Sequence, residues 1–422
     1  MGYKGFTCFS RFRPLDIYET CAIIVSMKIN CAYRFRIYPN KEQEQALARQ
    51  FGACRFVFNF FLRARMDYYA AHKNDRKKGL NYNDTAGMLT ALKRQPEYAW
   101  LNEANSQSLQ SSLKHLDVAY NNFYNKRAKF PRFKNKRGKQ SMTVPQHFSI
   151  RDGHLRIPKV SPIRMVEHRP IEGKIKHVTL SKTPSGEYYA SFCCEVDVPE
   201  PQPKQSGREI GLDLGLKSLL VTSDGERIDA PKFFRRSERR LAHLQRILSR
   251  RKKGSHGREK ARLAVARQHK RIANQRQDFL HKLTRRLVDE NQAIYAENLN
   301  VQGMMGNHCL AKSIADAAWG ELLRQLAYKG LWYGCQFSQI DRFFPSSKRH
   351  IACGWINENL TLADREWTCH GCGEIVDRDW NAALNILIFG QGSRAGAART
   401  STPVEMRNGA SVKPEAQALR LW

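Results

Sequence analysis

The sequence lacks long apolar runs. The longest one near the N-terminus, residues 21–25 (CAIIV), is far too short to cross a bilayer. Residues 1–26 also lack the cationic segment, apolar core and small-residue cleavage site, in that order, of a secretory signal peptide. We therefore expect a cytoplasmic protein with no membrane partner.

Acidic residues are scarce as well. Asp and Glu total 39 against 71 Lys and Arg, so the 422-residue chain has a formal net charge of +32 and a pI of about 10.0. Such an excess of positive charge is typical of proteins that bind a polyphosphate, and it favours nucleic acid over an anionic membrane. The length corresponds to about three domains.

Cysteine pairs are missing from most of the chain. Eleven cysteines make an odd number, and apart from the adjacent Cys193 and Cys194 they are scattered singly except near the C-terminus. This distribution favours reduced thiols over a disulfide framework. Only the C-terminal cysteines are candidates for metal binding.

The N-terminal half combines strand and helix patterns. Residues 33–38 (YRFRIY) alternate large and basic side chains, and Pro39 and Asn40 then predict the end of a strand and the start of a helix. An aromatic-rich helical region follows, and residues 142–198 return to short alternating strands, as in a small β-barrel or sheet. We predict a multidomain α+β fold in which an N-terminal β-barrel is interrupted by a helical domain.

The C-terminal half follows a proline-rich linker at 199–209. Its patterns predict a strand pair over 209–228, a helical hairpin over 232–290 and a strand over 292–298. The stretch RRLAHLQRILSRRKK in the hairpin has almost no acid, which favours a surface that faces nucleic acid over a merely solvated one. The basic segment 126–140 is either a solvated loop or a second phosphate-contacting segment.

Three acidic residues lie within these C-terminal patterns. Asp213 falls in mid-strand in IGLDLGL, where burial is costly without a cation or hydrogen-bond donors. Glu297 ends the apolar run AIYA, and sites are often built at strand ends, although a salt-bridged glutamate is the commoner case. Asp379 stands with Asp377 at the start of a helix predicted over 381–388, where acids also serve as caps.

Together, the three acids indicate a metal site. Hydrolysis of a phosphodiester by paired Mg²⁺ ions about 3.5–4 Å apart requires several carboxylates that converge on the ions. Two strand acids and one helix acid in one domain of a very basic chain fit this requirement.

A second metal site is indicated by two short pairs of ligands. Cys369 and Cys372 form a Cys-x-x-Cys pair, and His350 and Cys353 form another pair with the same gap. Fifteen residues separate the two pairs, which is within the usual spacing for structural zinc. His370 is the competing ligand if His350 points away, and unligated thiols are the alternative to a metal site.

Several segments resemble one known family. IGLDLGLKSLLV, IYAENLNVQGM, DRDWNAALNI, LAKSIADAAWGELLRQLAYKG and FFPSSKRHIACG are similar to segments of the TnpB family of transposon-encoded RNA-guided nucleases, and residues from Met27 onward resemble its usual opening. The resemblance implies a RuvC-like nuclease domain with an RNase H fold and an inserted zinc ribbon. Asp213, Glu297 and Asp379 would be its catalytic, Mg²⁺-binding acids.

The resemblance also implies roles for other parts of the chain. Family members commonly have four-cysteine ribbons, and this chain departs from that pattern by placing His350 at the first position. Asp377 would lie outside the catalytic triad. The segment NVQGMMGNHCLAKSIAD has the composition of a mobile lid and would gate the site.

Eight segments are expected along the chain. They are an uncertain or disordered extension at 1–26, a first barrel strand at 27–39, a helical recognition domain at 40–127, a basic loop and β-barrel at 128–204, a RuvC-like domain at 205–345, a zinc ribbon at 346–376, the end of the RuvC-like domain at 377–389, and a disordered tail at 390–422.

The implied function is RNA-guided cleavage of DNA. A monomer bound to a guide RNA from the transposon end would recognise double-stranded target DNA beside a short motif and cut both strands with Mg²⁺, while Zn²⁺ is structural. In a prokaryotic cytoplasm, such a protein would associate with the nucleoid when bound to DNA. An RNA-guided binding protein that no longer cuts would have lost one of the three acids, and all three are present.

Two further classes fit less well. A transposase that breaks and joins single strands would need a His-x-His pair with a tyrosine nucleophile, and no two histidines here are separated by one residue. A plain zinc-ribbon nucleic-acid binder would leave the three acids unexplained.

Overall fold

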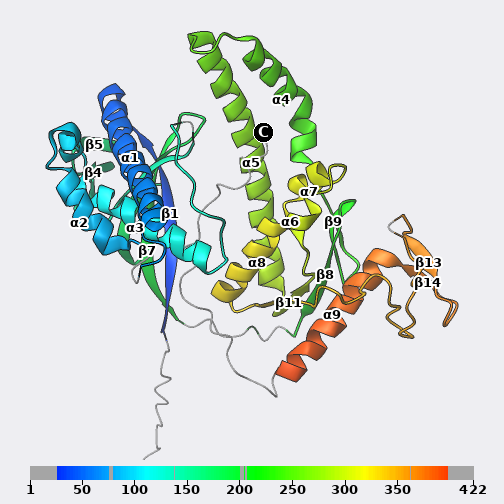
Figure 1. The fold of residues 1–422 in the computed structure, drawn as a ribbon. Helices are drawn as coiled ribbons and strands as arrows, with labels where there is room; N and C mark the ends of the chain where they lie inside the picture. Colours follow the sequence, from blue (N-terminus) through cyan, green and yellow to red (C-terminus); the bar gives the residue numbers. More distant parts are fainter. Residues whose placement is uncertain are drawn as a thin grey trace, which may run out of the picture.

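The structure is a computed structural model that describes residues 26–75, 79–136, 138–199, 204, 207–361 and 363–397. Two lobes lie side by side (Figure 1): an N-terminal lobe of one curled sheet with helices α1–α3, and a C-terminal lobe built from α4 to α9 and a second sheet. Most of the extension predicted at 1–26 and the tail beyond Ala397 fall outside the described residues.

The N-terminal sheet is organised around its first strand. β1 (Ser26–Tyr38) pairs antiparallel with β7 (Tyr188–Pro199) over nearly its whole length, and with β5 (Val160–Val166) at its end. Phe35 and Ile37 are buried on one face of β1, which is the face predicted by its alternating sequence. The remaining strands are β2 (Gln140–Val144), β3 (Ser149–Arg151), β4 (His154–Ile157) and β6 (Lys174–Lys182).

This sheet is antiparallel throughout, with the order β2-β6-β7-β1-β5-β4-β3. Among the described residues, no pairing between β2 and β3 closes it. The predicted barrel therefore stays a prediction, whereas the predicted strand over 27–39 is confirmed.

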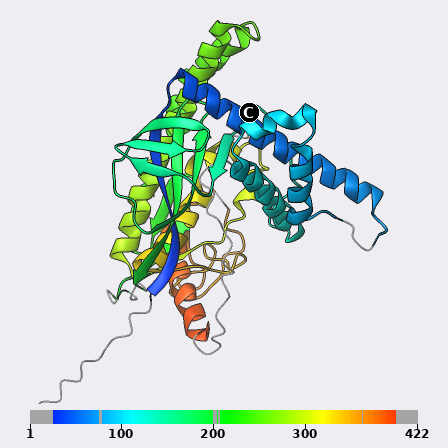
Figure 2. The same cartoon turned by 90° about the vertical axis from the view of Figure 1, so that its left-hand side faces the viewer.

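Helices cover one side of the curled sheet, as the turned view shows (Figure 2). They are α1 (Lys41–Ala71), α2 (Tyr82–Leu92), the 3-10 helix η1 (Pro96–Glu103) and α3 (Ser106–Tyr124). α1 begins where predicted because the side chain of Asn40 accepts from the amide of Gln43 and the Gln43 side chain accepts from the amide of Asn40. The rings of Phe51, Phe58 and Phe61 are buried, so these residues of the predicted helical region belong to the core of the lobe.

The C-terminal lobe contains a five-stranded sheet of order β10-β9-β8-β11-β12. Its strands are β8 (Glu209–Leu214), β9 (Ser218–Thr222), β10 (Arg227–Asp229), β11 (Ala293–Ala296) and β12 (Gln336–Gln339). β11 runs parallel to both β8 and β12, whereas β8, β9 and β10 form an antiparallel meander. The strand pair predicted over 209–228 is thus three strands, because the chain turns both before Ser218 and after Thr222.

Helices pack on both faces of this sheet. α5 (His256–Glu290) and α8 (Trp319–Tyr333) bury Leu280, Leu287 and Leu322 in one core, and α9 (Arg378–Ala397) buries Ile386 against Tyr295 in another. α4 (Phe233–Arg250) and α5 form the predicted basic hairpin, which projects away from the sheet (Figure 1). The short helices α6 (Val301–Met304) and α7 (Ala311–Ala317) occupy the predicted lid segment.

The predicted bounds of the last helix were wrong at both ends. α9 begins at Arg378 rather than residue 381, and it continues through residues that the sequence assigned to a disordered tail. Two contacts explain the extension. Gly390 lies so close to the ring of Tyr295 that a Cβ would collide with it, and Gln391 Nε2 donates to Glu209 Oε2 at 3.0 Å. Tertiary contacts therefore stabilise a segment whose own periodicity is weak.

A small two-stranded sheet precedes α9. β13 (Glu366–Thr368) and β14 (Ile375–Asp377) form a hairpin whose core is Trp367, Cys369 and Val376. Among the described residues, none of the helices combines the length and apolar character that crossing a bilayer requires.

Candidate active site and metal centre

Asp213 and Glu297 are brought together by the register of two parallel strands. Leu212 in β8 pairs with Ala296 in β11, so the next residue of each strand lies beside the other at the same edge of the sheet. Asp213 is only 8% exposed, and its side chain is within hydrogen-bonding reach of Glu297. The two carboxyl groups therefore share one partly buried position.

The electrostatics of this position disfavour two negative charges. Burial raises the pKa of Asp213 well above its usual range, and the carboxylates of Glu297 and Asp379 raise it further. Burial also raises the pKa of Glu297, although a hydrogen bond from Ser346 acts in the opposite direction. A cation placed among these groups would relieve both effects.

Asp379 reaches the same position from the first turn of α9. Its side chain is 14% exposed and lies near enough to Asp213 and Glu297 to affect their charges. Three guanidinium groups surround it, at 2.8 Å from Arg378, 3.3 Å from Arg365 and 3.9 Å from Arg227. These arginines escaped the sequence interpretation, because charge alone does not distinguish them from the other basic residues of this chain.

Asp377 has a different role from Asp379. Its carboxylate accepts a hydrogen bond from the amide of Trp380 at 2.8 Å, as expected of a residue that caps the start of α9, and it also pairs with Arg227. The capping role considered for both aspartates therefore describes Asp377, whereas the charge of Asp379 acts on the other two acids.

Gly211 allows α9 to lie against β8. A Cβ at this position would collide with the carbonyl oxygen of Ala383 and the amide of Leu387, both in α9. The helix backbone thus passes directly over the strand that holds Asp213, and this close approach fixes the position of Asp379 relative to Asp213. The glycine beside Asp213 in IGLDLGL therefore provides the space that the backbone of α9 occupies.

Ser346 is a site residue that the sequence interpretation missed. Its hydroxyl donates to Glu297 Oε1 at 3.1 Å, and its side chain is buried. The motif FFPSSKRH was noted only for its resemblance to a family, because a serine after a proline carries no periodic signal. Only tertiary contacts identify its partner.

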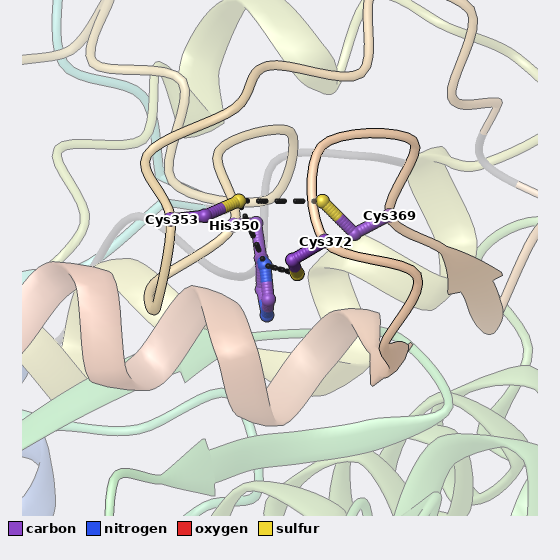
Figure 3. A group of neighbouring side chains, drawn as sticks. All are labelled: His350, Cys353, Cys369 and Cys372. Atoms are coloured by element: carbon purple, nitrogen blue, oxygen red, sulfur yellow. Dashed lines mark hydrogen bonds between the residues drawn. The ribbon is translucent and has the colours of Figure 1, made fainter.

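The four predicted zinc ligands converge (Figure 3). One donor atom from each of His350, Cys353, Cys369 and Cys372 lies within 4.8 Å of all the others. His350 Nδ1 is 3.2 Å from the sulfur of Cys353 and 3.3 Å from that of Cys372, and the sulfurs of Cys353 and Cys369 are 3.4 Å apart. Nearly 3.8 Å separates two sulfurs in a tetrahedral site with Zn–S bonds of about 2.3 Å. The donor set and its spacing therefore suit zinc.

The surroundings of His350 support this assignment. The ring is 2% exposed, and its Nε2 lies 3.4 Å from Glu374 Oε2 while Nδ1 faces the sulfurs. A carboxylate on the second nitrogen is the usual partner of a metal-binding histidine, because it fixes the tautomer and the orientation of the ring. His370, the competing candidate, is exposed and packs against Trp355 instead.

Helix α9 connects the two sites. Asn381 Nδ2 donates to the carbonyl of Arg349 at 2.7 Å, and its Oδ1 accepts from the amide of Ile351 at 2.9 Å. One turn later, Asn385 Nδ2 donates to the carbonyl of Ser346 at 2.9 Å. The helix that carries Asp379 therefore also holds the chain on both sides of His350.

Family models match three parts of the chain. A model described as a probable transposase matches residues 191–308, a helix-turn-helix model matches residues 27–74, and a Cas12f1-like TNB domain model matches residues 319–386. In this structure, residues 27–74 contain strand β1 and the long helix α1.

Full-length relatives decide the family. A Streptomyces pristinaespiralis protein provisionally named an RNA-guided DNA endonuclease is 41% identical over 87% of this chain and 91% of its own length. The chain belongs to the TnpB family. A second TnpB-type relative, InsQ of Escherichia coli K12, has the same provisional description and is 35% identical over 86% of this chain and 93% of its own length. The resemblance inferred from sequence motifs is thus confirmed.

The TnpB fold assignment agrees with a solved structure. A cryo-EM structure of a Cas12f1–sgRNA–target DNA complex contains a chain that matches 86% of this one and 98% of its own length, with a TM-score of 0.50 and 13% identity. This similarity shows a shared multidomain α+β fold and confirms the predicted class at that level.

Proposed function

We propose that this TnpB protein is an RNA-guided DNA endonuclease of a transposable element. Asp213, Glu297 and Asp379 would hold catalytic Mg²⁺ and cut both strands of the target at one site. The observation that carries the proposal is the convergence of these three carboxylates from β8, β11 and α9 in a chain of net charge +32. The names of its relatives support the guided activity.

The acids fit divalent cations in number and chemistry. They supply hard oxygen ligands, and the burial and mutual repulsion that raise the pKa of Asp213 are the conditions that a cation relieves. When bound, Mg²⁺ would polarise the phosphodiester and activate a water molecule for in-line attack. Asp213 and Glu297 would hold and position the cation, and Arg365 and Arg378, now paired with Asp379, would turn to the oxygens of the scissile phosphate.

We also propose the finer domain assignments. The five-stranded sheet with helices on both faces corresponds to an RNase H-like, RuvC-type domain, and residues 346–376 to its inserted zinc ribbon. The curled seven-stranded sheet would act as a barrel domain, and α1–α3 would recognise the motif beside the target. The basic hairpin of α4 and α5 would contact the nucleic-acid backbone, and the protein would act as a monomer with its guide.

Cleavage of a randomised library tests this function. The protein is purified with RNA transcribed from the downstream flank of its own gene and incubated with Mg²⁺ and plasmids that carry the guide-matched target beside randomised bases. We expect a linear product that depends on the guide and on one short flanking motif. Asp213→Ala should bind the same target and leave it uncut.

Two outcomes would contradict the proposal. If wild type and Asp213→Ala bind the matched target equally and neither cuts it, the protein is a guided binding protein without nuclease activity. If cutting occurs and does not depend on the guide, the acids form a nuclease site and the guided function is wrong.

A further inference from the structure

Ser346 lies between the two candidate metal sites. Its hydroxyl donates to Glu297 Oε1 at 3.1 Å, and its carbonyl accepts from Asn385 Nδ2 at 2.9 Å. It is 5% exposed and precedes the zinc ligand His350 by four residues. A single buried residue thus contacts one catalytic acid and the helix that carries another.

Asn385 and Asn381 hold the chain that follows Ser346. Both asparagines are 2% exposed and face the same side of α9, one turn apart. Asn385 also donates to the carbonyl of Arg349, and Asn381 contacts backbone groups of Arg349 and Ile351. The backbone on either side of His350 is therefore bound to α9 by side-chain amides, independently of any metal.

We infer that Ser346 is a positioning residue for Glu297, and that Asn385 holds Ser346 in place from α9. The inference rests on the proposed function, in which Glu297 binds the catalytic cation. The segment that contains the candidate zinc ligands would then have two roles. It would place Ser346 at the active site, and its zinc would stabilise a short segment that has little core of its own.

The position of Glu297 explains why it needs such a contact. Strand pairing of β11 ends at Ala296, so the glutamate lies beyond the ladder and its flexible side chain is not fixed by the sheet. Its neighbour Asp213 would repel it once both groups are charged. A donor on Oε1 fixes the orientation of the carboxylate that would bind the cation. Groups that orient metal ligands in this way typically change metal affinity about 10–100-fold.

The test compares Ser346→Ala with Ser346→Thr. We expect Ser346→Ala to raise the Mg²⁺ concentration for half-maximal guided cleavage roughly tenfold, with cleavage approaching the wild-type rate at saturating Mg²⁺. Ser346→Thr keeps the hydroxyl and should restore most of the affinity. Asn385→Ala should also raise the Mg²⁺ concentration for half-maximal cleavage, because it removes the support of Ser346 while the hydroxyl remains.

A matched control separates positioning from stability. Ser112 in α3 is also 5% exposed and donates one hydrogen bond, to the carbonyl of Ser108 at 3.0 Å in the other lobe. Ser112→Ala should lower stability by an amount similar to Ser346→Ala and leave the Mg²⁺ dependence unchanged. If the two variants affect Mg²⁺ dependence equally, or neither affects it, Ser346 has only a structural role.

A binding measurement distinguishes this inference from the proposed function. Mn²⁺ binding to the zinc-loaded protein, measured by calorimetry without substrate, should be about tenfold weaker in Ser346→Ala than in wild type. If wild type never cuts DNA and this difference persists, the proposed activity is wrong and the positioning role holds. If wild type cuts and Mn²⁺ binds both proteins equally, the positioning role is wrong.

Discussion

Asp213 and Glu297 lie side by side at the ends of two parallel strands, with their carboxyl groups in hydrogen-bonding reach. Neighbouring strands are about 4.8 Å apart, and successive side chains of a strand point to opposite faces. A shift of the strand pairing by one residue would therefore place the two acids on opposite faces of the sheet. Two carboxyl groups so close together in a partly buried position repel each other when both are charged, which is unfavourable for folding and is relieved by a cation.

Replacing one of these acids should stabilise the metal-free protein. Burial and the neighbouring carboxylates raise the pKa of Asp213, so the native state holds a proton that the unfolded chain releases as pH rises above about 4. Wild-type stability must fall with rising pH over that window. Asp213→Asn should raise the free energy of unfolding by about 1 kcal/mol at pH 8 and by less at pH 5, as measured by denaturant unfolding in Mg²⁺-free buffer. If the stability gain of Asp213→Asn over wild type does not increase with pH, burial of this carboxyl group does not destabilise the metal-free protein.

The two aspartates at the start of α9 should behave oppositely. Asp377→Ala removes a cap on the amide of Trp380 and should lower stability by about 1 kcal/mol while guided cleavage stays within a few-fold of wild type. Asp379→Ala should abolish cleavage and leave stability nearly unchanged, because the lost pairing with Arg378 and Arg365 is offset by relief of the repulsion of Asp213. Plasmid cleavage and chemical denaturation of both variants check this pair. Loss of cleavage in both would mean that Asp377 also serves the site.

Zinc content should depend on His350 and not on His370. Only His350 places a ring nitrogen among the three sulfurs, so His350→Ala should lower the zinc content of the purified protein well below one ion per chain. His370→Ala should retain zinc, because its ring packs on Trp355 at the surface. His350→Cys should retain zinc too, since a fourth thiolate is an equivalent ligand. Elemental analysis after dialysis measures all three, and zinc loss in His370→Ala would reverse the assignment.

The close approach of α9 to β8 should make Gly211 sensitive to a single methyl group. Gly211→Ala would place a Cβ against the backbone of Ala383, so we expect a loss of about 2–3 kcal/mol in stability and a large loss of cleavage. Gly392, in the same helix, has open space around its Cα, so Gly392→Ala should raise stability by up to about 1 kcal/mol. Thermal unfolding of the two variants gives the comparison. A gain or no change in the stability of Gly211→Ala would show that the contact with α9 does not limit this position.

A cluster of charges links the two lobes. Glu187, in the turn before β7, pairs with Lys270 of α5 and with Arg36 of β1. Burial opposes the charge of Glu187, but hydrogen bonds from Lys270, Arg36 and Ser185 outweigh it and lower its pKa to about 2. This stabilisation is complete above the unfolded pKa near 4.5 and is lost as pH falls towards 2.

Glu187→Gln should therefore lower stability by about 2 kcal/mol at pH 7, after allowance for screening of a partly exposed group. The deficit relative to wild type should shrink below pH 4, where the wild-type carboxylate gains its proton. Denaturant unfolding at pH 7 and pH 3.5 measures the difference. A deficit that is constant with pH would mean that packing, and not charge, joins the lobes.

The sequence by itself determined which residues are candidates for the chemistry. Asp213, Glu297 and Asp379 stand in strand and helix patterns that local periodicity reveals, and the spacing of the two ligand pairs predicts a zinc site because both members of each pair lie within one turn. The elements themselves were also predictable, from β1 and its capped helix α1 to the basic hairpin. These elements and ligand pairs are predictable because they are specified by residues close together in the sequence.

The tertiary structure decided which of two chemically equivalent residues lies at each candidate site. His350 and His370 have similar sequence contexts, as do Asp377 and Asp379, and only the packing of the β13–β14 hairpin against α9 separates them. Ser346 and Asn385 are 39 residues apart, so no local pattern could connect them to Glu297. The extension of α9 past residue 389 likewise depends on Tyr295 and Glu209, whose contacts exist only after the sheet has formed.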